Sequence, residues 1–489
     1  MSVPPHTTET THTVQLQRPF DPVISFRNSQ GEAARATLTS VQRRALVMEI
    51  YNPYSIVQVS EVLDDVNIRS GDRSIYKGKA VVVSLLNTGL MAVVSVALTD
   101  EWSDLNFAQG DPGQIAIETT RFVEGWEDRF RISQSYQVTI SEFRAFLAET
   151  SRWIGQAEMA KTLPRDAQGQ ITDEVFWAMA EPLMRKGKSF LVRLEGEASV
   201  ISPEDATLHR NYAQAALHPL VLRAPFVYRT FVKPLGYAGD YEMVNQLLGD
   251  PRQGSSTYIQ VVNATFLRAA VAEAHRNRID VLVTYLRRAA ALAESEGRLI
   301  RILNIGCGPA VEIQRLVASD VDLSRLQFTL IDFSRETLDY TREKVSQAAA
   351  LSGTALHVSY VQESVHELLK RAVRARHADA SEDLYDFIYC AGLFDYLSDK
   401  VCSRLIRYFV SKSRRGARML LTNVHASNPE RHGMEHLLEW HLIYRDERQM
   451  LEIMADVHAP IDLYTDPTGV NLFAETTLGG GSGDGGHGA

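Results

Sequence analysis

The pattern of apolar and polar positions changes character several times along the chain. Near the N-terminus, short apolar runs such as Ala45–Ile50 and Ile56–Val59 are separated by turn-forming residues. Several short strands at such spacing are typical of a small barrel or sandwich. We therefore expect a β-barrel over residues 21–108, preceded by a flexible polar tail over residues 1–20.

One apolar stretch, Ala80–Leu98, is about as long as a membrane-spanning helix. Its centre is the turn sequence Asn87-Thr88-Gly89, and valines dominate both flanks. A turn between two β-branched runs favours two buried strands over a single helix. The N-terminus also lacks the charged and apolar regions of a secretory signal. We therefore expect a cytoplasmic protein with no integral membrane segment.

Helical spacing dominates after the barrel, with helices predicted over residues 173–197 and 205–217. These helices indicate a helical linker bundle over residues 109–225. The next stretch, Arg223–Asp250, is less regular, and its part Lys233–Tyr241 contains one Pro and two Gly, which exclude a regular helix there. Such a loop before a catalytic domain is typical of a lid, although a plain connector would have the same composition.

Composition and charge narrow the class of protein. The chain has 489 residues, 45% of them apolar and 23% charged, with a formal net charge of −9. It lacks a clustered basic region, so a sequence-independent grip on nucleic acid is not expected. Its three cysteines, with no CxxC spacing, exclude a disulfide framework and a zinc site built on thiolates. We expect no metal.

The layout of the N-terminal strands resembles a PilZ-type β-barrel, whose family often binds a cyclic dinucleotide. That family reads its ligand with an RxxxR arm and a DxSxxG strand. In this sequence no RxxxR precedes the barrel, and Ser84 and Leu86 stand where the acid and the serine of the second motif would be. The sequence therefore predicts a degenerate barrel with a scaffolding or dimerising role.

After a long helix over residues 256–296, in one or two pieces, the pattern becomes strand, glycine turn and helix. The apolar run Leu299–Ile305 leads into Gly306-Cys307-Gly308-Pro309-Ala310, and a helix follows over 311–318. This is the nucleotide-binding start of a doubly wound α/β sheet. The next strand ends at Asp332, where a carboxylate can accept hydrogen bonds from both ribose hydroxyls.

The third small residue is Ala310, and Val311 fills the position of the last glycine in a dinucleotide fingerprint. This departure favours a ligand without phosphates, S-adenosylmethionine (SAM), over NAD, whose pyrophosphate needs that helix N-terminus. Further strands are predicted over residues 356–361, 385–389 and 417–422, followed by a terminal hairpin of 461–464 and 471–477. The antiparallel hairpin resembles the end of class I SAM-dependent methyltransferases. The fold class expected is therefore α/β, a Rossmann-like methyltransferase domain over 226–478, with a Gly-rich tail over 479–489.

Four stretches together resemble one narrower group. They are HPLVLRAPFVYRTFVKPLGYAGDYEMVN, NIGCGPAVEI, DFIYCAGLFDYLSD and TNVHASNPERHGMEHLLEWHLIYR. In combination they are similar to the methyltransferase family that includes the 3-hydroxy fatty acid (3-hydroxypalmitate) methyl ester synthases of bacterial quorum sensing. The resemblance covers about Leu217–Leu478 and implies SAM as cofactor and a fatty carboxylic acid as methyl acceptor.

The positions expected to hold the cofactor lie on the predicted lid and at the ends of the predicted strands: Tyr237, Tyr241, Asn304, Gly306, Cys307, Gly308, Asp332, Phe333, Glu363, Ser364, Ala391 and Gly392. Catalytic roles are predicted for Asp395, Tyr396 and His441, with His436 as a further base if the acceptor needs deprotonation. Substrate contacts are predicted for Glu435, Trp440, Tyr444 and Arg445. Met434, Leu437, Leu438, His441 and Arg445 share helical spacing, so part of this set is expected to be one side of a helix.

A carboxylic acid is ionised at neutral pH, so its methylation needs alignment and an apolar channel but no general base. Two alternatives stay open. One is O-, N- or C-methylation of a secondary metabolite with the help of a base. The other is a regulatory protein that binds SAM or a nucleotide without catalysis. The expected partner is a small molecule, and a homodimer is left open.

Overall fold

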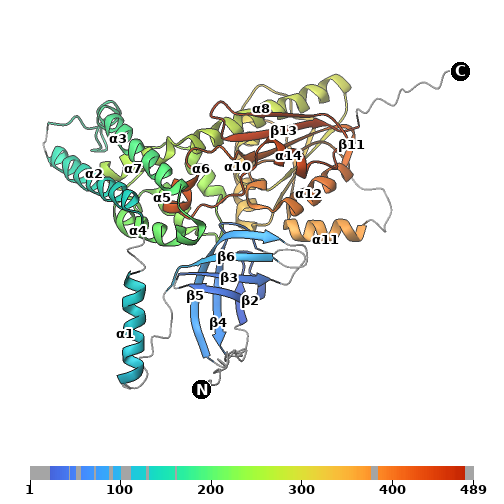
Figure 1. Cartoon of the computed structure of the whole chain (residues 1–489). Coiled ribbons are helices and arrows are strands. Elements are labelled where there is room, and N and C mark those ends of the chain that lie inside the picture. The colour runs from blue at the N-terminus through green and yellow to red at the C-terminus, as the bar shows by residue number, and fades with distance from the viewer. Residues whose placement is uncertain are drawn as a thin grey trace, which may run out of the picture.

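The computed structural model describes residues 23–42, 44–50, 57–70, 73–87, 92–100, 112–127, 132–159, 162–375 and 384–479. The predicted tail over 1–20 and the turn at Thr88-Gly89 lie outside these ranges, as does the Gly-rich end beyond Gly479. Figure 1 shows the blue N-terminal strands below the α/β domain, with a group of helices beside it.

The N-terminal region is a closed barrel in the order β1-β2-β3-β6-β5-β4, and all its described pairings are antiparallel. Its strands are β1 (Val23–Arg27), β2 (Ala33–Gln42), β3 (Ala45–Ile50), β4 (Val62–Ser70), β5 (Arg73–Asn87) and β6 (Ala92–Leu98). Strict alternation of buried and partly exposed residues along β6 points every second apolar side chain into the barrel.

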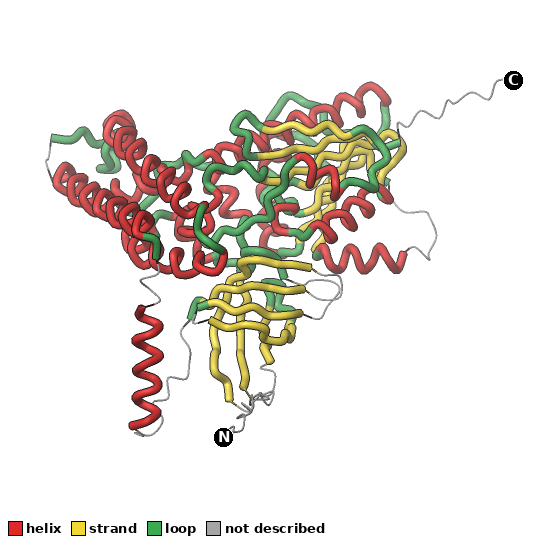
Figure 2. Tube along the Cα trace, viewed as in Figure 1, coloured by secondary structure: helices red, strands yellow, loops and turns green. Residues whose placement is uncertain are grey.

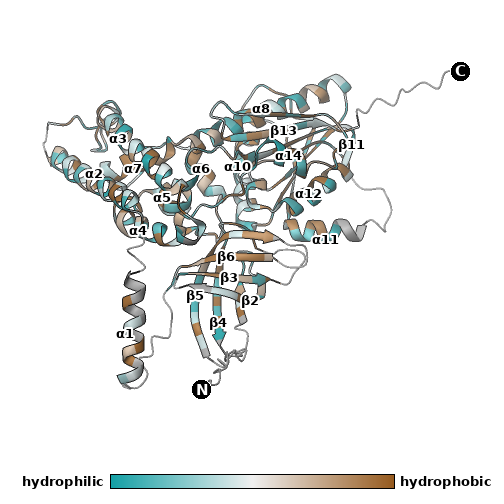
Figure 3. Cartoon of the chain, viewed as in Figure 1, coloured by the Kyte–Doolittle hydropathy of each residue, from teal (hydrophilic) through white to brown (hydrophobic). Residues whose placement is uncertain are grey.

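The apolar stretch Ala80–Leu98 forms parts of β5 and β6, as predicted, and Figure 3 shows hydrophobic colouring along these two strands. No helix among the described residues has both the length and the apolar character that crossing a bilayer requires. Of the strand predicted at Ile56–Val59, Ile56 lies outside the described residues, and the prediction is wrong for Val57–Val59, which form a loop and turn before β4. The reason is tertiary: Val57 packs in the barrel core, while Gln58 and Ser60 of the same loop contact the α/β domain.

Helices predominate between the barrel and the second sheet, as Figure 2 shows in red. They are α1 (Pro112–Glu127), α2 (Gln134–Met159), α3 (Asp173–Ser199), α4 (Pro203–Val221), α5 (Pro225–Val232), α6 (Tyr241–Leu248), α7 (Thr257–Leu267) and α8 (Ala270–Glu296). The predicted long helix is therefore two helices, α7 and α8. The stretch Arg223–Asp250 is more regular than predicted, since α5 and α6 flank the loop at residues 233–240.

The second sheet has the order β12-β13-β11-β10-β7-β8-β9. Its strands are β7 (Ile300–Ile305), β8 (Leu326–Asp332), β9 (His357–Gln362), β10 (Tyr385–Cys390), β11 (Ser413–Val424), β12 (Ile461–Thr465) and β13 (Asn471–Thr477). The strands β9, β8, β7, β10 and β11 are parallel neighbours, and β13 is antiparallel to β11 and β12. This confirms the predicted Rossmann-like sheet with its terminal hairpin.

Alternate residues of the central strands bury their side chains on opposite faces of this sheet. Ile302 of β7 packs in a core with α8, α9 (Val311–Val317) and α10 (Arg335–Ser352). Its neighbour Leu303 packs in another core with α11 (Val365–Ala375), α12 (Asp399–Ser411) and α14 (Glu447–Ile453). A strand covered on both faces reads as a continuous apolar run, which is why β7 was visible in the sequence.

The short helix α13 (Arg431–Leu438) belongs to the insertion after β11, yet it packs against α3 and α4. Its Leu437 shares one core with α2, α3 and α4, and so does Trp440. The described residues of the helical region therefore share one core with the insertion after β11. The helical region wraps around a part of the chain that comes about two hundred residues later.

The barrel contacts the α/β domain through Ser60, which lies in the left-handed region at φ 62°. Its hydroxyl accepts a hydrogen bond from the backbone N–H of His441 and lies 2.9 Å from the carbonyl oxygen of the same residue. Next to it, the backbone N–H of Val62 donates to the carbonyl of Gly236 at 2.6 Å. These contacts are buried, so they join the two regions by hydrogen bonds that water does not replace.

The Ser60 contact yields a stability prediction. Ser60→Ala leaves a buried N–H without its acceptor and should lower the free energy of unfolding by about 1–3 kcal/mol. Ser60→Gly removes the same hydroxyl but relieves the positive φ, so it should be about 1 kcal/mol less destabilising. Urea denaturation measures both values. Ser40→Ala, at an exposed barrel position, is the control, and an Ala variant as stable as that control would show that the contact contributes nothing.

Candidate functional site

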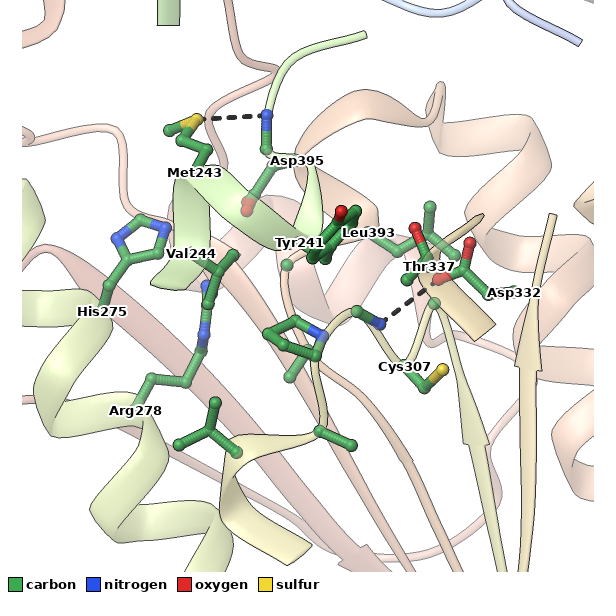
Figure 4. A pocket seen from close by; sticks show the side chains of 18 of the residues that line it. Tyr241, Met243, Val244, His275, Arg278, Cys307, Asp332, Thr337, Leu393 and Asp395 are labelled. Atoms are coloured by element: carbon green, nitrogen blue, oxygen red, sulfur yellow. Dashed lines mark hydrogen bonds between the residues drawn. The ribbon is translucent and has the colours of Figure 1, made fainter. Parts of the chain in front are cut away.

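A cavity lies at the carboxyl ends of the parallel strands, where the order of the sheet reverses between β7 and β10. This switch point is where ligands bind in open α/β sheets. The turns after β7 and β10 form its floor, while α8, the loop before α6 and the segment after α13 form its walls. Gln58 of the barrel completes the lining. Figure 4 shows labelled side chains of α6, of α8 and of the turns after β7 and β10 around this cavity.

The turn after β7 is the sharp glycine turn that the sequence predicted. Gly306 has φ 70° and Gly308 has φ 50°, and both line the cavity together with Asn304 and Cys307. A Cβ on Gly306 would lie only 3.2 Å from the side chain of Leu393, so only glycine fits comfortably there. The Gly306 N–H is held by the carbonyl of Ile331 at 2.8 Å, which fixes the turn against β8.

Asp332 ends β8 beside this turn. Its two carboxylate oxygens accept hydrogen bonds from the backbone N–H groups of Gly308, at 3.2 Å, and Ser334, at 3.0 Å. Burial raises the pKa of Asp332 to about 6, although these N–H groups favour the ionised form. The carboxylate is therefore oriented in the cavity wall and has free lone pairs for a ligand hydroxyl.

The predicted lid lies over this part of the cavity. The ring of Tyr237 packs edge-on against Phe333, with centroids 4.8 Å apart, and its hydroxyl lies 3.3 Å from Thr337. Tyr241 donates a hydrogen bond to Glu336 at 3.0 Å. Gly239 allows the loop to approach closely, because a Cβ there would lie 2.5 Å from the hydroxyl oxygen of Tyr396.

The turn after β10 faces the glycine turn across the switch point. The Gly392 N–H donates to Thr422 at 3.0 Å, and Ala391 and Gly392 both line the cavity. Asp395 follows, with one oxygen bound by the Val424 N–H at 2.6 Å, and burial raises its pKa to about 6. Tyr396 accepts a hydrogen bond from Trp440 Nε1 at 3.0 Å.

The predicted residues Glu363 and Ser364 line a second cavity that adjoins the first. Tyr237 and Phe333 line both cavities, so the two meet at this aromatic pair. The Glu363 carboxylate accepts hydrogen bonds from Nε and Nη2 of Arg371, at 2.9 and 2.7 Å. The opposite wall of this cavity comes from the barrel residues Ser29, Gln30 and Glu32.

The structure does not bring the rest of the predicted substrate set to the cavity. The prediction that part of the set with helical spacing forms one side of a helix is confirmed for Met434, Leu437 and Leu438, which are buried residues of α13. The helix ends at Leu438, and Glu439 turns left-handed at φ 47°, so His441 and Arg445 lie beyond it. His441 instead contacts Glu439, at 2.9 Å, and Arg210, at 3.2 Å. Residues absent from the cavity lining are Glu435, His436, His441, Tyr444 and Arg445.

Arg445 is buried and fully occupied within the chain. Its guanidinium donates to the carbonyls of Phe394 and Leu397, to the side-chain oxygen of Asn423, and to Asp399. It therefore fastens the start of α12 and the turn after β10 to the segment after α13. This placement gives Arg445 a structural role, in contrast to the predicted contact with substrate.

Sequence reasoning missed four charged or titratable residues of the cavity: His275 and Arg278 of α8, Glu312 of α9, and Tyr389 of β10. His275 and Arg278 project from the same helix into the cavity (Figure 4). A signal existed, because Arg278 lies four residues from the buried Ala274 and from the buried Leu282, and an Arg on such an apolar helix face is unusual. The spacing alone could not show whether that helix face packs against a core or lines a cavity.

Similar solved structures include the magnesium protoporphyrin IX methyltransferase of Synechocystis PCC 6803 with bound SAH, at 13% identity and TM-score 0.34, over 52% of this chain and 98% of that one. Another is a possible exported protein of Bordetella parapertussis, at 14% identity and TM-score 0.39, over 60% of this chain and 96% of that one. A third is the N-methyltransferase NodS of Bradyrhizobium japonicum WM9 with bound SAH, at 17% identity and TM-score 0.28, over 42% of this chain and 87% of that one. No protein-family model and no curated protein matches the chain. These TM-scores are low, and the fold assignment rests on the strand order of this chain.

The placement of Arg445 yields a prediction. Arg445→Met leaves buried carbonyls and an amide oxygen unpaired, so it should lower the free energy of unfolding by about 3–5 kcal/mol. Asp399→Asn should cost less than about 1 kcal/mol, because the Asp399 side chain is 70% exposed. Denaturant unfolding compares the two variants. A stable Arg445→Met protein with impaired acceptor binding would restore the substrate role predicted from the sequence.

The raised pKa of Asp332 yields a second prediction. If its carboxylate accepts hydrogen bonds from a ligand, S-adenosylhomocysteine (SAH) should bind more weakly as the pH falls below about 6, since protonation removes acceptor capacity. Asp332→Asn should bind SAH about 10- to 100-fold more weakly and without this pH dependence, as for a lost charge-assisted hydrogen bond.

Titration calorimetry between pH 5 and 8 provides the measurement. Asp339→Asn, an exposed carboxylate on α10, is the matched control and should behave as the wild type. Unchanged SAH affinity in Asp332→Asn would mean that this carboxylate does not contact the ligand.

Proposed function

We propose that this protein is a SAM-dependent methyltransferase. The observation that carries the proposal is the cavity at the switch point of the sheet, where the glycine turn and the Asp332 carboxylate meet. Helix α9 begins after Ala310, which is its N-cap at φ 48°, and Val311 stands in place of the last glycine of a dinucleotide fingerprint, which suits a nucleoside ligand that lacks phosphates. The strand order, with its terminal antiparallel hairpin, supports the same assignment.

The residues of the cavity fit this cofactor. SAM carries a ribose diol, an ammonium, a carboxylate and a sulfonium cation. Asp332 offers acceptors for the diol, and the side-chain oxygen of Asn304 is buried without a hydrogen-bond partner in the described structure, which suits an ammonium donor. The buried carboxylates of Glu312 and Asp395 make the cavity favourable for a cation. The adjoining cavity at Glu363 and Ser364 would take the adenine.

When bound, the cofactor supplies an electrophilic methyl group. The contribution of this chain is alignment and the exclusion of water, which together can account for roughly 7–11 kcal/mol of a barrier. Tyr237 and the loop before α6 cover the cavity, while Tyr396 and Trp440 hold one another by a hydrogen bond in its wall. These contacts would keep the two reacting groups in one orientation.

We further propose that the acceptor is a carboxylic acid with an apolar tail, such as a 3-hydroxy fatty acid. A third cavity, which is mostly apolar, supports this choice. It lies between α3, α7 and α13 and is lined by Leu191, Phe226, Phe266 and Met434, among others. Trp440 lines both this cavity and the first one. An acid group could thus lie on one side of Trp440 and a hydrocarbon tail on the other.

The histidine of the cavity also favours an acceptor that is already ionised. His275 Nδ1 contacts the carbonyl of Val271 at 2.7 Å, and burial together with the neighbouring Arg278 lowers the His275 pKa to about 3. Such an imidazole is a weak base at neutral pH. Asp395, with its raised pKa, is the residue that favours the second candidate, methylation of a hydroxyl with proton removal.

An activity experiment tests these alternatives. The protein is incubated with methyl-labelled SAM and with fatty acids, 3-hydroxy fatty acids or the matching alcohols, and products are identified by mass spectrometry. We expect methyl esters from the acids. Methyl ethers would favour the second candidate, and SAM binding without any product would overturn the acceptor while leaving the cofactor assignment intact.

A variant of the apolar cavity sharpens the test. Leu191→Trp should fill this cavity and raise KM for long-chain acids by about tenfold or more, as expected when roughly two methylenes lose their apolar contacts. The KM for a short-chain acid should not change, because that acid does not reach the cavity. Equal effects on both acids would show that the tail binds elsewhere.

A further inference from the structure

Arg278 is the single Lys or Arg among the described residues that line the first cavity. Its side chain is nearly inaccessible, with 6% of the residue exposed. Nevertheless, its Nη1 has no hydrogen-bond partner in the described part of the chain. A buried guanidinium nitrogen without a partner is costly, so its presence in a cavity indicates an anionic group that arrives from outside the chain.

The carboxylates that act electrostatically on Arg278 already accept hydrogen bonds from other groups. Glu312 accepts a hydrogen bond from the hydroxyl of Tyr389 at 2.8 Å, and Asp395 accepts one from the Val424 N–H at 2.6 Å. Neither forms an ion pair with Arg278 among the contacts of the described residues, although Asp395 raises the Arg278 pKa against the lowering effect of burial. Arg278 is therefore surrounded by negative charge yet keeps a free donor.

The backbone around Arg278 is shaped to admit its guanidinium. Gly392 has φ 93°, and a Cβ there would lie 3.2 Å from Nη1. The guanidinium thus packs against the turn after β10. Asn304 of β7 and Gly306 of the turn after β7 line the same cavity. His275, one helical turn earlier, lines the same wall, and its low pKa leaves Arg278 as the cation of this wall at neutral pH.

We infer that Arg278 is the carboxylate-binding residue of this cavity. The inference rests on the proposed function and adds the chemistry of one ligand group to it. A planar guanidinium offers two parallel N–H donors to a carboxylate, which gives both affinity and orientation. Two carboxylates could be bound there, that of the amino-acid end of the cofactor or that of the acceptor acid.

Binding measurements with Arg278→Met distinguish the two sources. Calorimetry uses SAH, which carries the amino-acid end, and methylthioadenosine, which lacks it. If Arg278 binds the cofactor end, SAH should bind about 10- to 100-fold more weakly, as for a lost hydrogen bond between charged groups, with methylthioadenosine unchanged. If it binds the acceptor, SAH affinity should be unchanged and the KM for the acid should rise by a similar factor.

The controls separate binding from folding. Arg287→Met changes an exposed arginine of the same helix and should leave both ligands unaffected. Arg278→Lys keeps the charge and should recover part of the lost affinity. We expect no loss of thermal stability in Arg278→Met, because it removes a buried, incompletely paired cation.

The outcomes also separate this inference from the proposed function. A wild-type protein that binds SAH, together with an Arg278→Met protein that matches it in SAH affinity and in acceptor KM, would overturn the role of Arg278 alone. A wild-type protein that binds neither SAH nor methylthioadenosine would overturn the proposed function and this inference with it.

Discussion

The extended segment Glu439–Arg445 is the part of the chain on which the rest of the structure depends. It is buried, it has no helix or strand of its own, and buried backbone groups must still be hydrogen-bonded. Its partners come from distant regions: Ser60 of the barrel bonds His441, Asn423 bonds the Ile443 carbonyl, and the carbonyl of Asp395 accepts from the Ile443 N–H. The side chain of Arg445 fastens its end. The hydrogen bonds that this irregular segment requires thus join the barrel, the helical region and the sheet.

This arrangement explains why the barrel and the helical region line cavities that the sheet alone would leave open. Gln58 lines the first cavity and lies two residues before Ser60, which binds the segment Glu439–Arg445. Ser29 lines the second cavity, and its backbone N–H is held by the Glu61 carboxylate. From the other side, α3 and α7 enclose the apolar cavity behind Trp440. The sheet supplies the edge at which a ligand binds, and the two other regions determine what else fits there.

The sequence predicted those features that are encoded locally. The strand β7, the glycine turn at Gly306 and the acid Asp332 follow one another within a short stretch, and their chemistry requires only a sheet edge. Residues whose position depends on tertiary contacts were misread or missed. Arg445 looked like a substrate contact because a guanidinium can bind a carboxylate through two hydrogen bonds. The sequence did not show that its donors are used by Asp399, Asn423 and two backbone carbonyls. Arg278 looked like one more polar position of a long helix, since a sequence does not show what a helix face covers.

The balance of charge in the first cavity connects these observations. Three carboxylates, Asp332, Asp395 and Glu312, lie buried around it, and burial raises the pKa of each. A cavity with this much negative charge is unfavourable unless cations enter it, and one buried arginine with a free donor does not neutralise three acids. A ligand that brings two cationic groups and one carboxylate has a net charge of +1, so it would offset part of this excess negative charge and complete the hydrogen bonding of Arg278. If the carboxylate at Arg278 is that of the cofactor, the unpaired oxygen of Asn304 and the unpaired nitrogen of Arg278 would together bind its amino-acid end, the first as an acceptor for the ammonium and the second as a donor to the carboxylate.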